Sequence, residues 1–166
     1  MLLGTWHMSW TVADIERSIA FYTKLGFALV HYQEQHNEYT ERLVGLAGAH
    51  LKVAMMKFED VAPGFSGHAI ELVQYVEPKG RHLDMRPCDI NAAHLAIGTD
   101  DAQALYERMS GAGGTCVSPP VAITAGMNKG GFTCYMRDPD GFIIELMQPP
   151  RWRLEGRAAP EEASAP

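Results

Sequence analysis

The chain contains two copies of one pattern, and this repeat constrains the fold more than any other feature. His7 is followed seven residues later by Asp14, and His94 is followed seven residues later by Asp101. Each copy then closes on the same tripeptide, Ile-Glu-Leu, at 70–72 and 144–146. Because a chain of 166 residues is expected to form one domain, the repeat predicts two similar modules that share it.

The first copy has the pattern of a strand, a helix and three further strands. Apolar and polar residues alternate from Thr5 to Thr11, which is the period of a strand and puts His7 on its more polar face. Asp14 is suited to cap the following helix, and Gly26 is suited to end it. The pattern then predicts strands at 27–34, 51–58 and 69–75, with a short helix at 37–46.

The second copy repeats this order with shorter connections. We expect a strand at 92–98, a helix at 101–110 and short strands at 115–118, 131–137 and 142–147. The last two strands are joined by Asp138-Pro139-Asp140-Gly141, a strong turn sequence because proline fixes one dihedral and glycine accepts a positive one. The order of elements predicts an α+β fold with a largely antiparallel sheet and helices on one side.

Four side chains at matching positions of the two copies could bind a metal ion. His7, Glu71, His94 and Glu145 each lie opposite the apolar residues of their strands, so all four are predicted to avoid the helix-packed face. A single histidine or glutamate in such a place is more often structural or solvated. Four at repeated positions favour a site, since two imidazoles and two carboxylates can form the protein ligands of one divalent cation.

Several other residues are assigned structural or surface roles. His68 falls on the opposite strand face from Glu71 and is excluded as a ligand. Tyr135 could reach a substrate, but an aromatic at such a position is more often part of the core. Four histidines have no partners like those of the repeated His and Glu residues, namely His31, His36, His50 and His82. Five large apolar residues are expected to pack between helix and sheet, namely Trp6, Met8, Trp10, Met55 and Met56.

Composition excludes some partners. The net charge of -6, without a basic stripe, disfavours nucleic acid. No segment has the pattern of a signal peptide or a membrane span, and the three cysteines have no paired spacing, so we expect a cytoplasmic protein with free thiols and no membrane partner. Residues 151–166 lack apolar periodicity and are expected to form a disordered tail.

The chain resembles the vicinal oxygen chelate superfamily, which includes glyoxalase I, methylmalonyl-CoA epimerase, extradiol dioxygenases and bleomycin resistance proteins. The resemblance covers residues 3–148 and is most specific in three motifs. They are H-M-S-W-T-V-A-D with F-Y-x-x-L-G-F, then H-L-A-I-G-T-D-D, then R-D-P-D-G-F-I-I-E-L. It implies one domain over 1–150, with modules at about 3–77 and 91–148 that form one open, cup-like sheet of two βαβββ units with helices outside.

The resemblance also implies a function. His7, Glu71, His94 and Glu145 match the metal ligands of the glyoxalase and epimerase branch, with Glu71 and Glu145 as candidate bases. The implied cofactor is one divalent ion, Zn, Mn, Ni, Co or Fe, and the implied activity is isomerase or lyase chemistry on a small oxygenated substrate, with homodimers expected. Two alternatives stay open, an Fe(II) extradiol-type dioxygenase, which the extra carboxylate at Glu71 disfavours, and a non-catalytic small-molecule binding or resistance protein.

Overall fold

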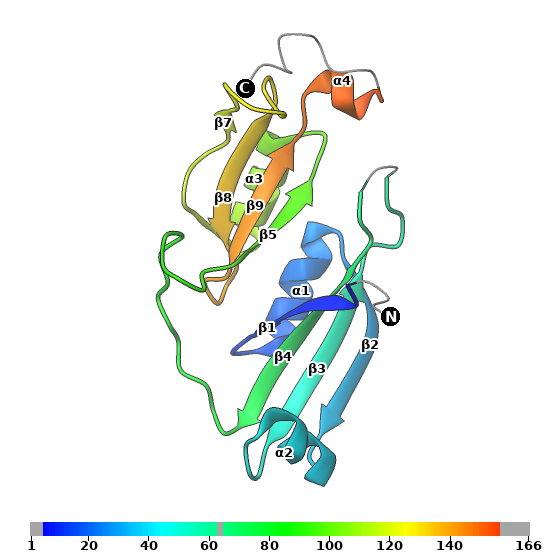
Figure 1. Ribbon diagram of the computed structural model, residues 1–166, viewed down its shortest axis with the longest axis vertical. Helices are drawn as coiled ribbons and strands as arrows, with labels where there is room; N and C mark the ends of the chain where they lie inside the picture. The colour runs from blue at the N-terminus through cyan, green and yellow to red at the C-terminus, as the bar shows by residue number, and fades with distance from the viewer. Residues whose placement is uncertain (1–4, 63–64, 157–166) are drawn as a thin grey trace. The chain divides into compact units, whose positions relative to one another are not determined.

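The computed structural model describes residues 5–62 and 65–156 and separates the chain into two compact units, residues 1–83 and 84–166. Each unit has its own hydrogen-bonded sheet with a long helix on one face (Figure 1). The mixed α+β class predicted from the sequence is therefore confirmed. None of the helices in the described ranges is long and apolar enough to cross a membrane.

Unit 1 follows the predicted order of elements. Its sheet has the order β1-β4-β3-β2, in which β1 runs parallel to β4 and the other pairs are antiparallel. The elements are β1 (His7–Thr11), α1 (Ile15–Leu25), β2 (Ala28–Gln35), α2 (Glu38–Val44), β3 (His50–Lys57) and β4 (Ala69–Glu77).

Local sequence explains both ends of α1. The Asp14 side chain accepts a hydrogen bond from the Arg17 backbone N–H at 3.0 Å, so it caps the helix as predicted. Gly26 ends the helix at φ 115°, a conformation that only glycine adopts without strain. The buried face of the helix includes Tyr22, whose ring meets Trp10 edge-to-face with centroids 5.4 Å apart.

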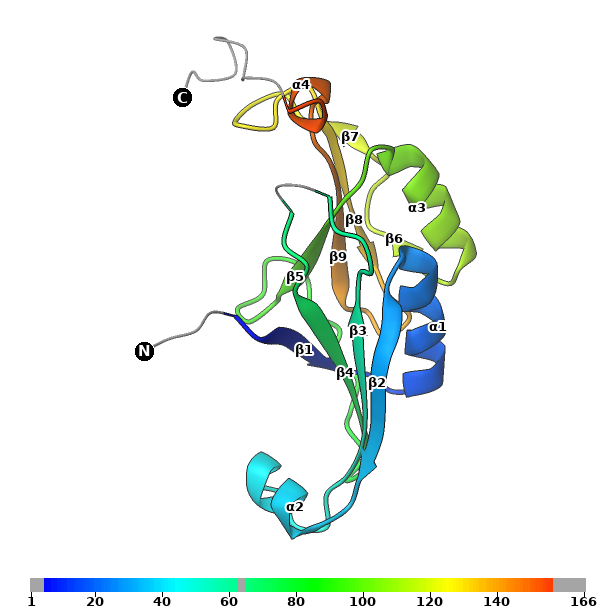
Figure 2. The same cartoon turned by 90° about the vertical axis from the view of Figure 1, so that its right-hand side faces the viewer.

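The second helix of unit 1 lies on the other face of the sheet. Figure 2 shows α1 and α2 on opposite sides of the strands β2, β3 and β4. Val44 of α2 and Tyr75 pack against a small buried cluster formed by Leu51, Val53 and Val73. Because side chains alternate along β4, Val73 and Tyr75 share a face with Glu71. The helix therefore covers one end of the face that carries Glu71.

Unit 2 contains one strand that the sequence does not predict. Its sheet has the order β5-β9-β8-β6, with the two-residue strand β7 also paired to β8. Strands β5 and β9 are parallel and the other pairs antiparallel. The elements are β5 (His94–Gly98), α3 (Ala102–Gly111), β6 (Thr115–Cys116), β7 (Val121–Ala122), β8 (Phe132–Arg137), β9 (Ile143–Gln148) and α4 (Arg151–Leu154).

The turn between β8 and β9 has the structural role predicted for it. The buried Asp138 carboxylate accepts hydrogen bonds from the backbone N–H groups of Asp140 and Phe142 at 2.9 and 2.8 Å. Gly141 has φ 88°, which the turn requires. Arg137 adds a hydrogen bond to the Gly141 carbonyl at 2.8 Å. These contacts fix the hairpin that carries Glu145.

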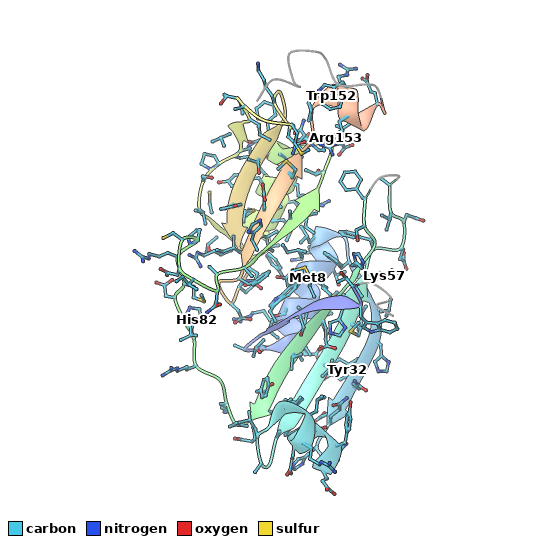
Figure 3. All side chains as sticks on the ribbon, in the orientation of Figure 1. Met8, Tyr32, Lys57, His82, Trp152 and Arg153 are labelled. Atoms are coloured by element: carbon cyan, nitrogen blue, oxygen red, sulfur yellow. The ribbon has the colours of Figure 1, made fainter. Side chains whose placement is uncertain are left out.

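Two sequence expectations are wrong. Trp6 and Met8 do not pack under a helix, because they are 83% and 39% exposed, and only Trp10 on that face meets α1. The tail is not disordered at its start, since Arg151–Leu154 form a helical turn supported by a 2.7 Å hydrogen bond from Arg151 to Glu155. Met8 on β1 and Arg153 on α4 can be located in Figure 3. Residues 157–166 of the expected tail lie outside the described ranges.

Candidate metal-binding pairs

In unit 1 the parallel pairing of β1 with β4 brings His7 and Glu71 together. The register sets His7 opposite Ala69 and Ser9 opposite Glu71, so His7 and Glu71 are diagonal neighbours on one face. The His7 Nε2 atom lies 3.7 Å from Glu71 Oε2. Their contact therefore depends on the closing of the first strand onto the last strand of the unit.

Unit 2 repeats the same arrangement. The parallel pairing of β5 with β9 sets His94 opposite Ile143, two residues before Glu145, which is the offset found in unit 1. The His94 Nε2 atom lies 3.3 Å from Glu145 Oε2. The structure thus brings the four predicted residues together as two histidine–glutamate pairs, one in each unit.

Each glutamate is also held by a hydroxyl group. Ser9 donates to Glu71 Oε1 at 3.2 Å, and Thr133 donates to Glu145 Oε1 at 2.9 Å. In both pairs one carboxylate oxygen accepts from a hydroxyl while the other faces the histidine. Oε2 is therefore the carboxylate oxygen that lies nearer the imidazole in both pairs.

The strands next to the glutamates give the two pairs different surroundings. Met55 lies opposite Glu71 on β3, whereas Tyr135 lies opposite Glu145 on β8. The Tyr135 ring is 5.4 Å from the His94 ring at a tilt of 40°. Tyr135 is therefore a half-buried neighbour of the pair, which fits the less common of the two roles that the sequence allows for it. Met55 also lies on the Glu71 face, and only Met56 packs on the helix side.

The donors suit a divalent metal ion. Neutral imidazole nitrogen and carboxylate oxygen are ligands that Zn, Mn, Ni, Co and Fe all accept. His7 Nδ1 is buried and has no hydrogen-bond partner. A hydrogen bond at this atom, which a purely structural histidine normally makes, is therefore missing. Within neither unit, over residues 5–62 and 65–156, does a third His, Cys, Asp or Glu gather with a pair into a group that could hold a metal.

The other histidines take no part in these pairs. His68 contacts the Ser66 hydroxyl in the loop before β4. His50 lies 2.5 Å from Glu34 and stacks on His36 with ring centroids 5.0 Å apart. The pairing of β2 with β3 brings the carboxylate of Glu34 to His50, a contact outside the repeated pattern that the sequence does not indicate.

The sequence reasoning missed four residues around the pairs. Ser9 and Thr133 hold the glutamates, while Gln74 and Gln148 accept hydrogen bonds from the first N–H groups of α1 and α3. The glutamines could have been found, because each stands three residues after its glutamate in the pattern Ile-Glu-Leu-x-Gln. Thr133 has no such signal, since its partner is decided by pairing between strands.

The sequence of the chain is similar to those of several known proteins. The family model described as the Glyoxalase/Bleomycin resistance protein/Dioxygenase superfamily matches residues 6–146. A probable lactoylglutathione lyase of Vibrio parahaemolyticus is 34% identical over 148 residues, covering 86% of this chain and 88% of the relative. A 2-epi-5-epi-valiolone epimerase of Actinomyces sp is 28% identical over 149 residues, covering 87% and 78%.

Solved structures give the same fold. A glyoxalase family protein from Bacillus cereus superposes with a TM-score of 0.79 at 22% identity, covering 90% of this chain and 96% of that one. Glyoxalase I of Leishmania major gives 0.59 at 22% identity, covering 91% and 89%. At these identities the likeness concerns the fold alone.

Proposed function

The chain belongs to the Glyoxalase/Bleomycin resistance protein/Dioxygenase superfamily, and on that premise we propose that it is a divalent-metal-dependent lyase or isomerase acting on a small oxygenated substrate. The relatives named lactoylglutathione lyase and 2-epi-5-epi-valiolone epimerase support an enzyme of this kind. The observation that carries the proposal is the duplication of the histidine–glutamate pair with the same strand offset in both units.

The proposed metal ligands are His7 and Glu71 in unit 1 and His94 and Glu145 in unit 2. Two carboxylates offset the charge of the ion, and two imidazoles add affinity. A metal bound to these groups would polarise a substrate carbonyl and stabilise the negative charge that develops on its oxygen. Side chains of the protein would carry out the proton transfer.

Proton transfer is the step that these side chains can perform. A glutamate carboxylate beside the substrate can take the proton from the carbon next to the carbonyl, and the C–H electron pair then forms an enolate. Return of the proton to the other face of the same carbon gives an epimer. Where that carbon also carries a hydroxyl, loss of the hydroxyl proton and protonation of the neighbouring carbon and its oxygen move the carbonyl to the first carbon. Met55 lies opposite Glu71 on β3, and Val73 follows two residues later on the same face of β4.

Solvent exchange tests this function directly. The purified protein would be loaded in turn with Zn²⁺, Mn²⁺, Ni²⁺, Co²⁺ or Fe²⁺ and incubated in D₂O with lactoylglutathione or with 2-epi-5-epi-valiolone, the compounds in the names of its relatives. We expect NMR to show metal-dependent loss of a proton next to the carbonyl.

His94→Ala is the matched variant, and its exchange should fall to the metal-free level. Binding of either compound without any exchange would support the non-catalytic alternative, and oxygen consumption with Fe²⁺ would support the dioxygenase. Failure of the wild-type protein to bind any of the five metals would contradict the proposal.

A further inference from the structure

An arginine that follows the last strand lies at one end of the sheet face that carries Glu145. We propose that Arg153, held in place by Asn128, binds a carboxylate of the substrate, so that the protein favours a substrate with this charge over a neutral one. This rests on the proposed function, because it concerns the far end of a substrate whose carbonyl group is held at a metal. All the residues involved belong to unit 2.

Two contacts orient the side chain of Asn128. Its Nδ2 group donates to the Met147 sulfur at 3.9 Å, and its Oδ1 atom accepts a hydrogen bond from Arg153 Nη1 at 2.7 Å. Met147 stands two residues after Glu145 on β9, so strand alternation puts both side chains on one face of the sheet. Asn128 therefore connects Arg153 to the face that carries Glu145.

The helical turn that carries Arg153 is fixed to the end of β9. At Gly131 the loop before β8 approaches the strand so closely that a Cβ would lie 2.2 Å from the Gln148 carbonyl oxygen. The Arg153 backbone N–H donates to the Pro150 carbonyl at 2.9 Å. Figure 2 shows α4 beyond the end of β9 and apart from α3, and Arg153 is labelled there in Figure 3. The backbone of Arg153 thus has a defined position relative to β9.

The guanidinium of Arg153 has an edge that no described residue occupies. Only its Nη1 atom donates to Asn128, and no carboxylate within the described part of the chain pairs with it. Its Nε and Nη2 groups can donate side by side to the two oxygens of a carboxylate. One guanidinium balances the single charge of a carboxylate but leaves part of the charge of a phosphate dianion unbalanced. The geometry and charge therefore favour a carboxylate.

The separation of Arg153 from Glu145 limits the length of such a substrate. Two residues of a strand span about 7 Å, which applies to Glu145 and Met147. Asn128 contacts Met147, and Arg153 contacts Asn128 in turn. A substrate that reaches both a metal at Glu145 and the guanidinium therefore needs a chain of several bonds between its carbonyl group and its carboxylate.

Chelating probes can test this role of Arg153 without knowledge of the substrate. A hydroxamate binds a divalent metal through two oxygens, and a carboxylate can be attached to it through methylene chains of increasing length. Isothermal titration would compare each acid with its methyl ester on Co²⁺-loaded wild type and Arg153→Gln. At the best chain length, we expect the wild type to bind the acid at least about tenfold more tightly than the ester, and Arg153→Gln to bind both equally.

Arg151→Gln is the matched control. It removes the same charge from the same helical turn, but Arg151 is already paired with Glu155 at 2.7 Å, so the preference for the acid should change by less than about threefold. Asn128→Ala should reduce the preference, because Arg153 loses the group that holds it. Arg153→Lys should restore only part of it, since an ammonium group has no edge for two oxygens.

Equal affinity of the wild type for acid and ester at every chain length would overturn the proposal. A preference for the acid that persists in Arg153→Gln would do the same, and tighter binding of a phosphonate than of the carboxylate of equal length would overturn the choice of a carboxylate. Unchanged affinity for the ester shows that a variant keeps its fold. Failure of the proposed function is seen separately, before any probe is added, if the wild-type protein does not bind Co²⁺.

Discussion

Gln148 accepts a hydrogen bond from the backbone N–H of Ala102 at 2.9 Å, which joins the end of β9 to the first residue of α3. Gln74 accepts from the Ile15 N–H at 3.0 Å in the same way. Both glutamines stand three residues after a proposed metal ligand. The strand that carries each glutamate is therefore tied to the start of the helix that packs behind it.

Loss of either glutamine side chain should destabilise the unit that contains it. Gln148→Ala and Gln74→Ala each leave a partly buried helical N–H without its acceptor, which costs about 1–3 kcal/mol of unfolding free energy. Urea denaturation measures the change. Gln103→Ala is the control, because that side chain makes an exposed hydrogen bond to Glu107 of its own helix, and its effect should stay below about 0.5 kcal/mol.

The helix caps predict a second pair of effects. Asp101→Ala removes the acceptor of the Ala104 N–H at 2.9 Å, and Asp14→Ala removes that of the Arg17 N–H. Each should lower the free energy of unfolding by about 1 kcal/mol. Asp100→Ala, one residue before the cap, should leave the urea midpoint unchanged, and an equal loss there would argue against specific capping.

Gly131 should tolerate no side chain. A Cβ at this position would lie 2.2 Å from the Gln148 carbonyl oxygen and 3.1 Å from the Pro150 nitrogen, both of them backbone atoms. We expect Gly131→Ala to cost at least about 2 kcal/mol, measured by thermal unfolding. Gly111→Ala meets no atom within 4 Å and lies within α3, so it should be neutral or slightly stabilising.

Alkaline pH should weaken unit 2 through Cys134. Burial, reinforced by the nearby Cys116 and Glu145, raises the pKa of the Cys134 thiol to about 11 from its ordinary value of 9.0. Above pH 9 the unfolded chain loses this proton first and binds fewer protons than the folded one, so stability falls as pH rises.

The expected loss is about 1–2 kcal/mol between pH 9.0 and about 11. Urea denaturation at a series of pH values measures it. Cys134→Ala should flatten this part of the curve, whereas alanine at the exposed Cys88 should not. If the free energy of unfolding of Cys134→Ala fell with pH as steeply as that of the wild type, a different titrating group would cause the loss of stability.

Metal addition should stabilise the wild-type chain. Free Co²⁺ at 100 times its Kd is expected to raise the unfolding free energy by about 2.7 kcal/mol, since the ion binds the folded form. Differential scanning calorimetry with and without EDTA measures the shift. His7→Ala and His94→Ala should both lose it, and His68→Ala, whose side chain contacts Ser66 instead, should keep it.

Most of the fold could be predicted because its signals are local. Asp14 and Gly26 mark the two ends of α1, and the turn at Asp138 marks the last hairpin, through contacts within a few residues. The side of the sheet that α2 covers was not predictable, since its short length gives no clear apolar stripe. Trp6 and Met8 share a face with Trp10, but alternation does not tell how far a helix extends over a strand.

The candidate site could be predicted in part for the same reason. Strand alternation placed His7 and Glu71 on a face away from α1, and the structure brings them within 3.7 Å. The neighbours Tyr135 and Thr133 depend on which residues of β8 lie opposite and diagonal to Glu145. That register is decided by the whole hairpin and its packing, so a single strand's sequence does not reveal it.

The two hydroxyl contacts also differ in when they can form during folding. Thr133 and Glu145 are 12 residues apart on neighbouring strands of one hairpin, whereas Ser9 and Glu71 are 62 residues apart and meet only when the first strand closes onto the last. Short loops close sooner and at lower entropic cost than long ones. The Glu145 carboxylate is thus expected to be oriented early in folding, and completion of the Glu71 pair marks the last stage.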